Sequence, residues 1–268
     1  MRIHLFTTDP SGLQLENMLP SGVELSCVII PQNRRTSEKV ANVVELCQRS
    51  NIEVFEHKRG EALPNTLPIA ERAISWLYSQ IISKKDLERY PRGMLNMHGG
   101  KIPDYRGANV MQWQIINGEK ELGITWHEIV EEVDAGPIWA ETVIPINEDA
   151  TAFELRNDMI HAGVTLFKEA WLNSTSENFI PRKPDLRKGR VWPNRQPKDG
   201  FLTSEFTAKE VRNTVRALSP PWPPATIEIG GKIVAINGVF NMPAHDRIPY
   251  KTADGETLYL DTYDIGAQ

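Results

Sequence analysis

The chain has 268 residues, a length that suits one large domain or one domain with a smaller appendage. Its composition, 40% hydrophobic and 24% charged, is that of a globular protein and excludes a disordered chain. No apolar run approaches the roughly 20 residues of a membrane-spanning helix, and the net charge of −5 argues against a general nucleic-acid binder.

The first part of the chain alternates apolar strands with amphipathic helices. Strands are predicted over residues 2–8, 22–31, 53–57, 73–79 and 93–98, and helices over 37–49, 107–117 and 151–172. In the last helix Thr151 and Glu154 fit a capping box, and five side chains share one face: Phe153, Ile160, Val164, Phe167 and Trp171. The alternation predicts an α/β fold with a Rossmann-like, mostly parallel sheet and helices on both faces.

Residues 181–199 are basic and rich in proline and glycine, so we interpret them as a linker between two units. The predicted domains are therefore 1–180, with the α/β fold, and 200–268. The second unit is predicted to contain one helix, over 208–218, and strand-like segments at 225–229, 233–236 and 257–262. We expect it to be a small β-rich domain.

Asn96 and His98 lie two residues apart at the end of the strand predicted over 93–98, so both side chains share one face. Ligands of an open parallel sheet bind outside the carboxyl ends of its strands. An amide that stabilises an oxyanion and an imidazole that moves a proton together suit acyl transfer. Asp134 adds a carboxylate in a turn before Ala135 and Gly136. Taken alone, each of these residues is more often a loop or turn former.

The remaining polar candidates carry weaker signals. His4, His57, His127, His161 and His245 are each expected to be surface or packed histidines. Cys27 and Cys47 have no CxxC partner, so no metal site and no disulfide framework is predicted. This cysteine usage and an N-terminus unlike a signal peptide favour a cytoplasmic protein.

The segment 95–138 resembles the signature of folate-dependent formyltransferases. Its elements occur here in the family's order at Asn96, His98, Pro103, Arg106, Gly107, Gly118, Gly123, Thr125, Asp134 and Gly136. One departure is Gly99-Gly100 in place of the usual Pro-Ser, with Lys101 in place of a leucine. The resemblance extends more weakly over residues 1–200.

The resemblance implies 10-formyltetrahydrofolate as formyl donor, no metal, and Asn96, His98 and Asp134 as catalytic residues. In the implied mechanism Asn96 and protonated His98 stabilise the oxyanion, while Asp134 orients His98 and assists proton transfer. The family segment that walls the pterin pocket matches residues 78–82 here, so folate is expected to contact Tyr78, Gln80, Ile81 and Ile82.

The resemblance leaves several acceptors open. Nucleotide-linked amino sugars are favoured because Trp113, His127 and the Pro-Pro-Trp222-Pro-Pro run are similar to the N-formyltransferases of such sugars. The resemblance also implies a role in polysaccharide biosynthesis. It is compatible with a homodimer. The acceptor is expected to contact Lys101, Tyr105, Arg106 and Trp222.

Other classes fit less well. Glycinamide ribonucleotide formyltransferases are shorter, and formyltetrahydrofolate hydrolases carry an N-terminal regulatory domain. Methionyl-tRNA formyltransferases need a broad basic face for nucleic acid, which an acidic chain does not favour. A catalytically silent folate-binding module is a further alternative, which the intact Asn96, His98 and Asp134 disfavour.

Overall fold

The computed structural model describes residues 1–265, which form two compact units. The first unit contains residues 1–106, 123–142 and 160–190, and the second contains 107–122, 143–159 and the chain from Val191 onward. The predicted division into 1–180, 181–199 and 200–268 stays a prediction. Each unit is described by itself.

A seven-stranded sheet forms the centre of the first unit, in the order β3-β2-β1-β4-β5-β7-β8. The first five strands along the chain are parallel, and β7 runs antiparallel to β5. Its strands are β1 (Arg2–Thr7), β2 (Glu24–Pro31), β3 (Glu53–His57), β4 (Arg72–Trp76), β5 (Met94–His98), β7 (Glu121–Glu128) and β8 (Ile138–Pro145). The prediction of a Rossmann-like, mostly parallel sheet is confirmed.

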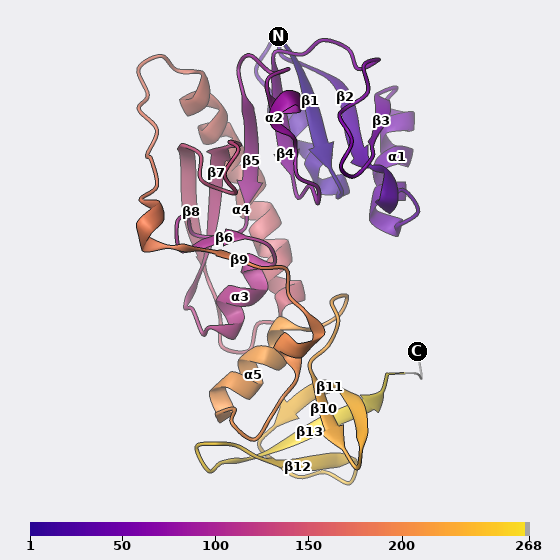
Figure 1. Cartoon of the computed structure of the whole chain (residues 1–268), viewed down its shortest axis with the longest axis vertical. Helices are drawn as coiled ribbons and strands as arrows, with labels where there is room; N and C mark the ends of the chain where they lie inside the picture. Colours follow the sequence, from indigo (N-terminus) through magenta and orange to yellow (C-terminus); the bar gives the residue numbers. More distant parts are fainter. Residues whose placement is uncertain (266–268) are drawn as a thin grey trace. The chain divides into compact units, whose positions relative to one another are not determined.

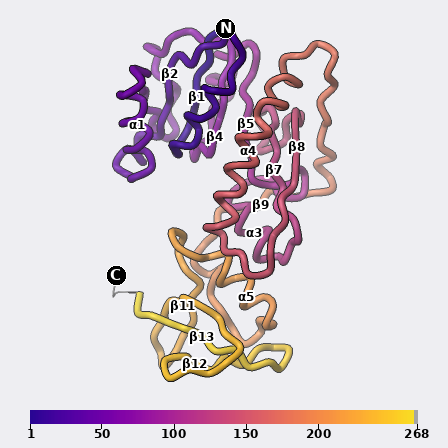
Figure 2. Tube along the Cα trace, turned by 180° about the vertical axis from the view of Figure 1, so that it is seen from behind, coloured from indigo at the N-terminus to yellow at the C-terminus, as the bar shows by residue number. Residues whose placement is uncertain are grey.

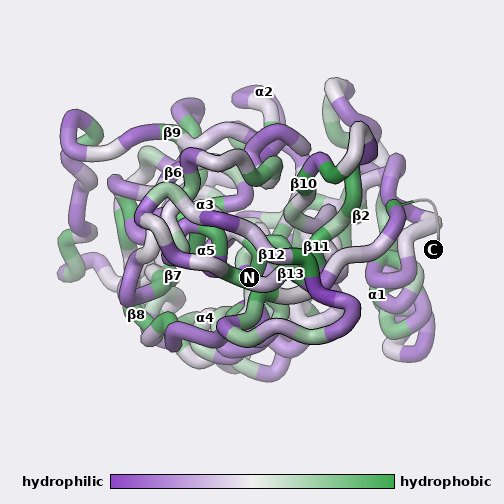
Figure 3. The backbone as a smooth tube through the Cα atoms, turned by 90° about the horizontal axis from the view of Figure 1, so that it is seen from below, coloured by the Kyte–Doolittle hydropathy of each residue, from purple (hydrophilic) through white to green (hydrophobic). Residues whose placement is uncertain are grey.

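Helices flank this sheet, as the alternating pattern predicts. In α1 (Glu38–Arg49) the apolar face buries Val40, Val43 and Cys47, and Figure 3 shows its hydrophobic and hydrophilic residues alternating. Figures 1 and 2, which view the unit from opposite sides, show α4 (Ala152–Thr175) against β5, β7 and β8. The prediction placed Phe153 on one face with Phe167 and Trp171, which are buried, but the structure leaves Phe153 52% exposed.

Gly163 allows α4 to approach the sheet closely. A Cβ atom there would lie 3.1 Å from Trp76 and 3.3 Å from Met97, and the Gly163 carbonyl accepts a 2.9 Å hydrogen bond from the Trp126 indole. The helix is therefore anchored on β4, β5 and β7, the strands that carry the candidate site.

Several elements were not predicted. They are the strands β7, β8 and β12 (Arg247–Lys251), the short strands β6 (Tyr105–Gly107) and β9 (Arg190–Trp192), which pair with each other, the helix α2 (Lys84–Leu87), and the 3-10 helices η1 (Pro10–Met18), η2 (Gln32–Arg34), η3 (Leu186–Lys188) and η4 (Pro197–Gly200). The sequence of β7 does not alternate regularly between apolar and polar residues, because the strand is buried on both faces from Leu122 to His127.

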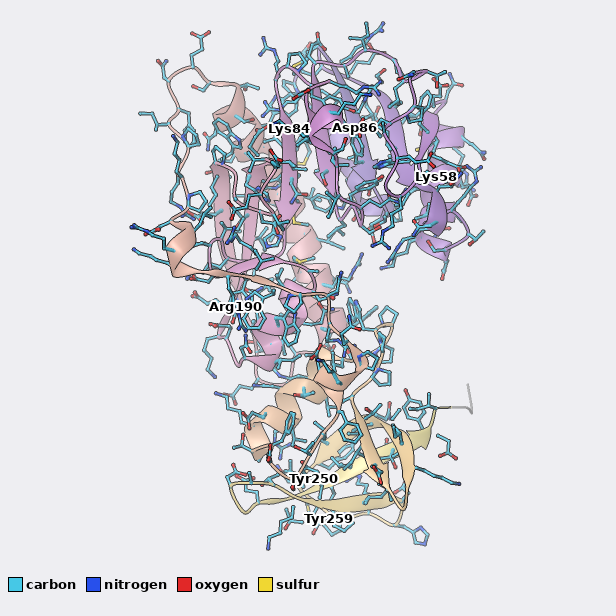
Figure 4. All side chains as sticks on the ribbon, viewed as in Figure 1. Lys58, Lys84, Asp86, Arg190, Tyr250 and Tyr259 are labelled. Atoms are coloured by element: carbon cyan, nitrogen blue, oxygen red, sulfur yellow. The ribbon has the colours of Figure 1, made fainter. Side chains whose placement is uncertain are left out.

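The second unit holds an antiparallel sheet of order β10-β11-β13-β12 and the helices α3 (Val110–Ile116) and α5 (Ala208–Ala217). The sheet's strands are β10 (Thr226–Ile229), β11 (Lys232–Phe240), β12 (Arg247–Lys251) and β13 (Thr257–Asp264). Helix α5 begins at a capping box formed by Thr207 and Glu210. Tyr250, labelled in Figure 4, donates its hydroxyl to the Thr203 carbonyl. The prediction of a β-rich C-terminal part is confirmed.

A buried ion pair joins β4 to β7 across β5 in the first unit. Arg72 is 2% exposed, and its Nη2 lies 3.6 Å from Glu128 Oε2. Glu128 also accepts from the Met94 amide and, at 3.1 Å, from the Trp139 indole. Burial lowers the pKa of the Arg72 guanidinium, whereas the charge of Glu128 raises it. The pair therefore stabilises both charges inside the sheet.

We predict that Glu128→Ala lowers the free energy of unfolding by ~3 kcal/mol, because it leaves the buried Arg72 charge without its partner. Urea denaturation followed by tryptophan fluorescence measures this change. Glu56→Ala is the matched control, since it breaks the exposed pair with Arg35 and should cost below ~1 kcal/mol. Equal losses in the two variants would contradict a stabilising role for the buried pair.

Candidate active site

Strand β5 carries Asn96 and His98 on one face, with His98 as its last residue. In the register of the sheet, Asn96 lies opposite Ser75 of β4 and His127 of β7. His98 lies opposite Thr125 and is 6% exposed. Both side chains are therefore held by paired strands on either side.

The loop between β7 and β8 brings Asp134 to these two residues. The two ends of this loop are joined by a 2.9 Å hydrogen bond from the Glu128 amide to the Pro137 carbonyl. Asp134 adopts a left-handed conformation with φ +47, which aspartate tolerates better than most residues. A Cβ atom at Gly136 would lie 1.9 Å from the Glu128 carbonyl oxygen, so the loop requires glycine there.

Asp134 lies between two histidines. Its Oδ2 is 3.5 Å from His98 Nδ1, and its Oδ1 is 3.4 Å from His127 Nε2. Both distances exceed those of tight charge-assisted hydrogen bonds, as is common in sites that tighten only when substrate binds. The structure thus brings together Asn96, His98 and Asp134, for which the sequence showed no mutual contact.

The hydrogen bonds of His98 indicate which protons its ring carries. Its Nε2 lies 2.6 Å from the Tyr105 carbonyl oxygen, which can only accept, so Nε2 donates. Its Nδ1 faces the Asp134 carboxylate. The backbone therefore occupies Nε2, and Nδ1 is the ring nitrogen that faces the Asp134 carboxylate and the site.

The segment after β5 contains three of the predicted acceptor-binding residues. Tyr105 is 7% exposed, and its backbone carbonyl holds His98. Arg106 is also buried and donates from Nη1 to Glu132 Oε1 at 2.8 Å and to the Val133 carbonyl at 3.3 Å. These bonds fix the loop just before Asp134, while Lys101 is exposed. The acceptor role of all three stays a prediction.

The glycine pair after His98 is held against β7. Thr125 Oγ1 donates to the Gly100 carbonyl at 2.8 Å. At Gly123, a Cβ atom would lie 2.4 Å from the Lys101 amide nitrogen, so this strand residue must be glycine for the segment to pack so closely. The backbone of residues 100–101 therefore lies tight on β7.

The predicted folate segment follows β4, next to β5 in the sheet. Tyr78 Oη lies 2.8 Å from His57 Nδ1, and the two rings stack with planes 5° apart. His57 Nε2 lies 3.0 Å from the Glu61 carbonyl, so it donates there and its Nδ1 accepts from Tyr78. Burial raises the pKa of the Tyr78 phenol, which therefore stays neutral.

Gln80 is tied to the same region, since its Nε2 donates to Asn33 Oδ1 at 3.1 Å and to the His57 carbonyl at 3.3 Å. Ile82 is 8% exposed within the core, whereas Ile81 is 84% exposed. The role of Tyr78, Gln80, Ile81 and Ile82 in folate binding stays a prediction.

The helix α2 supports the neighbouring loop. Asp86, labelled in Figure 4, accepts from the Leu63 amide at 3.0 Å and from the Ser83 hydroxyl at 2.6 Å. Arg89 donates to the Leu63 and Pro64 carbonyls at 3.2 Å. The loop around residues 63–64 is thereby held by two charged side chains.

Trp222 belongs to the second unit and is partly buried. Its indole nitrogen lies 3.1 Å from the side-chain oxygen of Gln112 in α3, in the amide orientation that also lets Gln112 donate to the Asn109 carbonyl. The indole N–H of Trp222 thus has a hydrogen-bond partner within its own unit. Its predicted contact with the acceptor stays a prediction.

His57 and His127, each expected to be a surface or packed histidine, are both packed, and their contacts also make them candidates for the site. Both are 1% exposed, and both make hydrogen bonds to residues of the candidate site. The signal that could have identified His127 is its position in β7, where Gly123, Thr125 and His127 share one face.

Within residues 1–265 there is no group of three or more His, Cys, Asp or Glu side chains that could hold a metal ion. In the same range no helix has both the length and the apolar character needed to cross a membrane.

Comparison with solved structures shows the fold. HypX from Aquifex aeolicus (A392F-I419F variant) is 21% identical, with a TM-score of 0.65 over 99% of this chain and 44% of its own. The N-formyltransferase from Helicobacter canadensis, in complex with folinic acid and dTDP-3-aminofucose, is 19% identical, with a TM-score of 0.72 over 98% and 99%. A 4-N formyltransferase from Francisella tularensis is 19% identical, with a TM-score of 0.73 over 88% and 96%.

The chain spans less than half the length of the HypX structures that it matches. Its family is shown by a different comparison, in which the model of the formyl transferase family matches residues 30–171. That match covers more than half of the chain and includes Asn96, His98 and Asp134. The chain therefore belongs to the formyl transferase family.

Proposed function

We propose that this protein transfers a formyl group from 10-formyltetrahydrofolate to the amine of a nucleotide-linked amino sugar. The observation that carries the proposal is the meeting of Asn96, His98 and Asp134, with the Asp134 carboxylate 3.5 Å from His98 Nδ1. The similar Helicobacter canadensis enzyme, solved with folinic acid and dTDP-3-aminofucose, supports both the donor and the acceptor class.

In the proposed reaction the acceptor's neutral amine bonds to the formyl carbon, and the formyl oxygen gains negative charge. The Asn96 amide donates a hydrogen bond to this oxygen, and so does Nδ1 of the protonated His98 ring, whose contact with Asp134 is long at 3.5 Å, while Nε2 stays bound to the Tyr105 carbonyl. Asp134 takes the proton that the attacking nitrogen releases, and this proton moves to the folate nitrogen as its bond to the formyl carbon breaks. The products are the N-formyl sugar and tetrahydrofolate.

The residues after β4 fit a folate ring. In the described part of the chain, Oε1 of Gln80 is buried without a hydrogen-bond partner, and it could accept from an amino group of the pterin. Tyr78 is fixed by its hydrogen bond with His57, and Ile81, three residues along the chain, leaves an apolar side chain exposed. These features support the binding of a flat, polar-edged ring in this segment.

The alternative acceptor, methionyl-tRNA, is not favoured. A nucleic-acid substrate calls for a basic face, but the chain has a net charge of −5. We also propose a cytoplasmic location, which suits the two buried free cysteines, Cys27 and Cys47. Burial raises the pKa of the Cys47 thiol to about 11, so it stays protonated and unreactive.

The proposed function is tested by incubating the protein with 10-formyltetrahydrofolate and a panel of nucleotide-linked amino sugars, with methionyl-tRNA as the competing acceptor. We expect mass spectrometry to show a gain of one formyl group on at least one sugar and none on the tRNA. Formylation of the tRNA alone, falling steeply with salt, would contradict the sugar acceptor.

We predict that Asn96→Ala, His98→Ala and Asp134→Ala each lower kcat by ~100-fold or more, because each removes a group that acts on the reacting atoms. Steady-state kinetics with the sugar identified above measures this effect, and circular dichroism checks folding. His161→Ala is the control, since His161 lies exposed on α4. A variant with the rate of the wild type would remove that residue from the mechanism.

We further predict that Trp222→Ala raises KM for the sugar ~10-fold to 100-fold, the loss expected for one stacked base, with folate binding unchanged. The comparison of both KM values measures this. Because the indole also contacts Gln112, Gln112→Ala serves as the matched variant. An equal rise in both variants, accompanied by a fall in melting temperature, would assign Trp222 to packing alone.

A further inference from the structure

His127 is buried beside the candidate catalytic residues, on the strand next to theirs. It is 1% exposed and lies directly opposite Asn96 in the register of β5 and β7. Its ring also meets that of His98 edge to face, with centroids 6.1 Å apart. The side chain therefore has no freedom to leave the site without disturbing both strands.

The backbone determines which nitrogen of His127 carries a proton. Nδ1 lies 2.8 Å from the carbonyl oxygen of Glu128. A carbonyl can only accept, so Nδ1 must donate. In the neutral ring Nε2 then carries a lone pair, and it is a hydrogen-bond acceptor that points toward β5.

Asn96 is the partner that uses this acceptor. Its Nδ2 lies 3.0 Å from His127 Nε2, within hydrogen-bond distance. The amide nitrogen has two hydrogens, of which His127 takes one. Asp134 Oδ1 lies 3.4 Å from the same Nε2, longer than an ordinary N–H···O hydrogen bond. Asn96 is therefore the closer partner of Nε2, and this contact favours the amide orientation with Nδ2 toward His127.

We propose that His127 is a positioning residue, which holds the Asn96 amide with its second N–H available for the formyl oxygen. This inference rests on the proposed formyl transfer. Without the acceptor at Nε2, the amide can turn and present its own oxygen to the formyl oxygen. The two oxygens would repel each other, and the oxyanion would lose a donor.

Two substitutions separate the two ring nitrogens. In His127→Gln the side-chain oxygen can occupy the place of Nε2 and accept from Asn96, but the donor to Glu128 is lost. In His127→Asn the side-chain nitrogen can occupy the place of Nδ1 and donate to Glu128, but the acceptor is lost. A merely structural role predicts similar effects of both, and His161→Asn, at an exposed position on α4, is the control.

We expect His127→Asn to lower kcat ~10-fold to 100-fold, somewhat less than the loss of a whole oxyanion donor, with KM for folate and sugar unchanged. His127→Gln should recover most of this loss, and His161→Asn should match the wild type. Equal kcat values for His127→Asn and His127→Gln would overturn the proposal. Melting temperatures of all variants identify any that fail to fold.

A double-mutant cycle tests whether the effect passes through Asn96. When Asn96 is already alanine, His127→Asn should lower kcat less than ~3-fold, since coupled residues are not additive. A loss as large as in the wild-type background would show that His127 acts independently of Asn96, and this would contradict the proposal.

A spectroscopic measurement separates failure of this inference from failure of the proposed function. In protein with 15N-labelled histidine, NMR should show His127 protonated at Nδ1 and unprotonated at Nε2, with its signals assigned by their absence from His127→Asn. An Nε2-protonated ring would overturn the inference even in an active enzyme. If the wild type formylates no amine, the proposed function fails, and the role in catalysis fails with it.

Discussion

The candidate site depends on the antiparallel pairing of β5 with β7. The other strand pairs from β1 to β5 are parallel, and in a purely parallel sheet the strand beside β5 would bring its own carboxyl end to the site. Here the reversed strand places His127 beside Asn96 and Thr125 beside His98. A shift of one residue in this register would turn His127 to the other face of the sheet.

The same strand also positions the loop that carries Asp134. Glu128, the last residue of β7, closes the base of the loop with its amide and pairs with Arg72 through its side chain. Gly93 and Gly136 both lie so close to Glu128 that a Cβ atom at either would overlap it. The partly buried Glu128 carboxylate therefore links the catalytic strand to its neighbours, and the Glu128 backbone holds the Asp134 loop. Arg106 secures the far part of that loop.

Much of the first unit could be predicted because its signals are local. The buried face of α1, the capping box of α4 and the apolar runs of the parallel strands are each contained within a few residues. The pair Asn96 and His98 was found for the same reason, as two polar residues at the end of one strand. The motif order then supplied Asp134 through a family resemblance, without showing its contact with His98.

The rest of the site depends on long-range pairing, which one sequence does not display. Strand β7 was missed because burial on both faces removes its alternation, and His127 acquires a partner only through the register with β5. The hydrogen bond between Tyr105 and His98 uses a backbone carbonyl, so no pattern of side chains in the sequence could reveal it. The contact of His57 with Tyr78 was likewise not predicted, because it joins the end of β3 to the segment after β4, and β2 and β1 lie between these strands in the sheet.

The central claim is that the paired strands β5 and β7 present a prepared oxyanion site to the formyl group. A crystal structure with a stable 10-formyltetrahydrofolate analogue and the nucleotide product tests this most directly. The account predicts the formyl oxygen within hydrogen-bond distance of Asn96 Nδ2 and of the His98 ring, with His127 Nε2 still bonded to Asn96. A formyl group placed away from Asn96, or an Asn96 amide turned from His127 toward other partners, would contradict it.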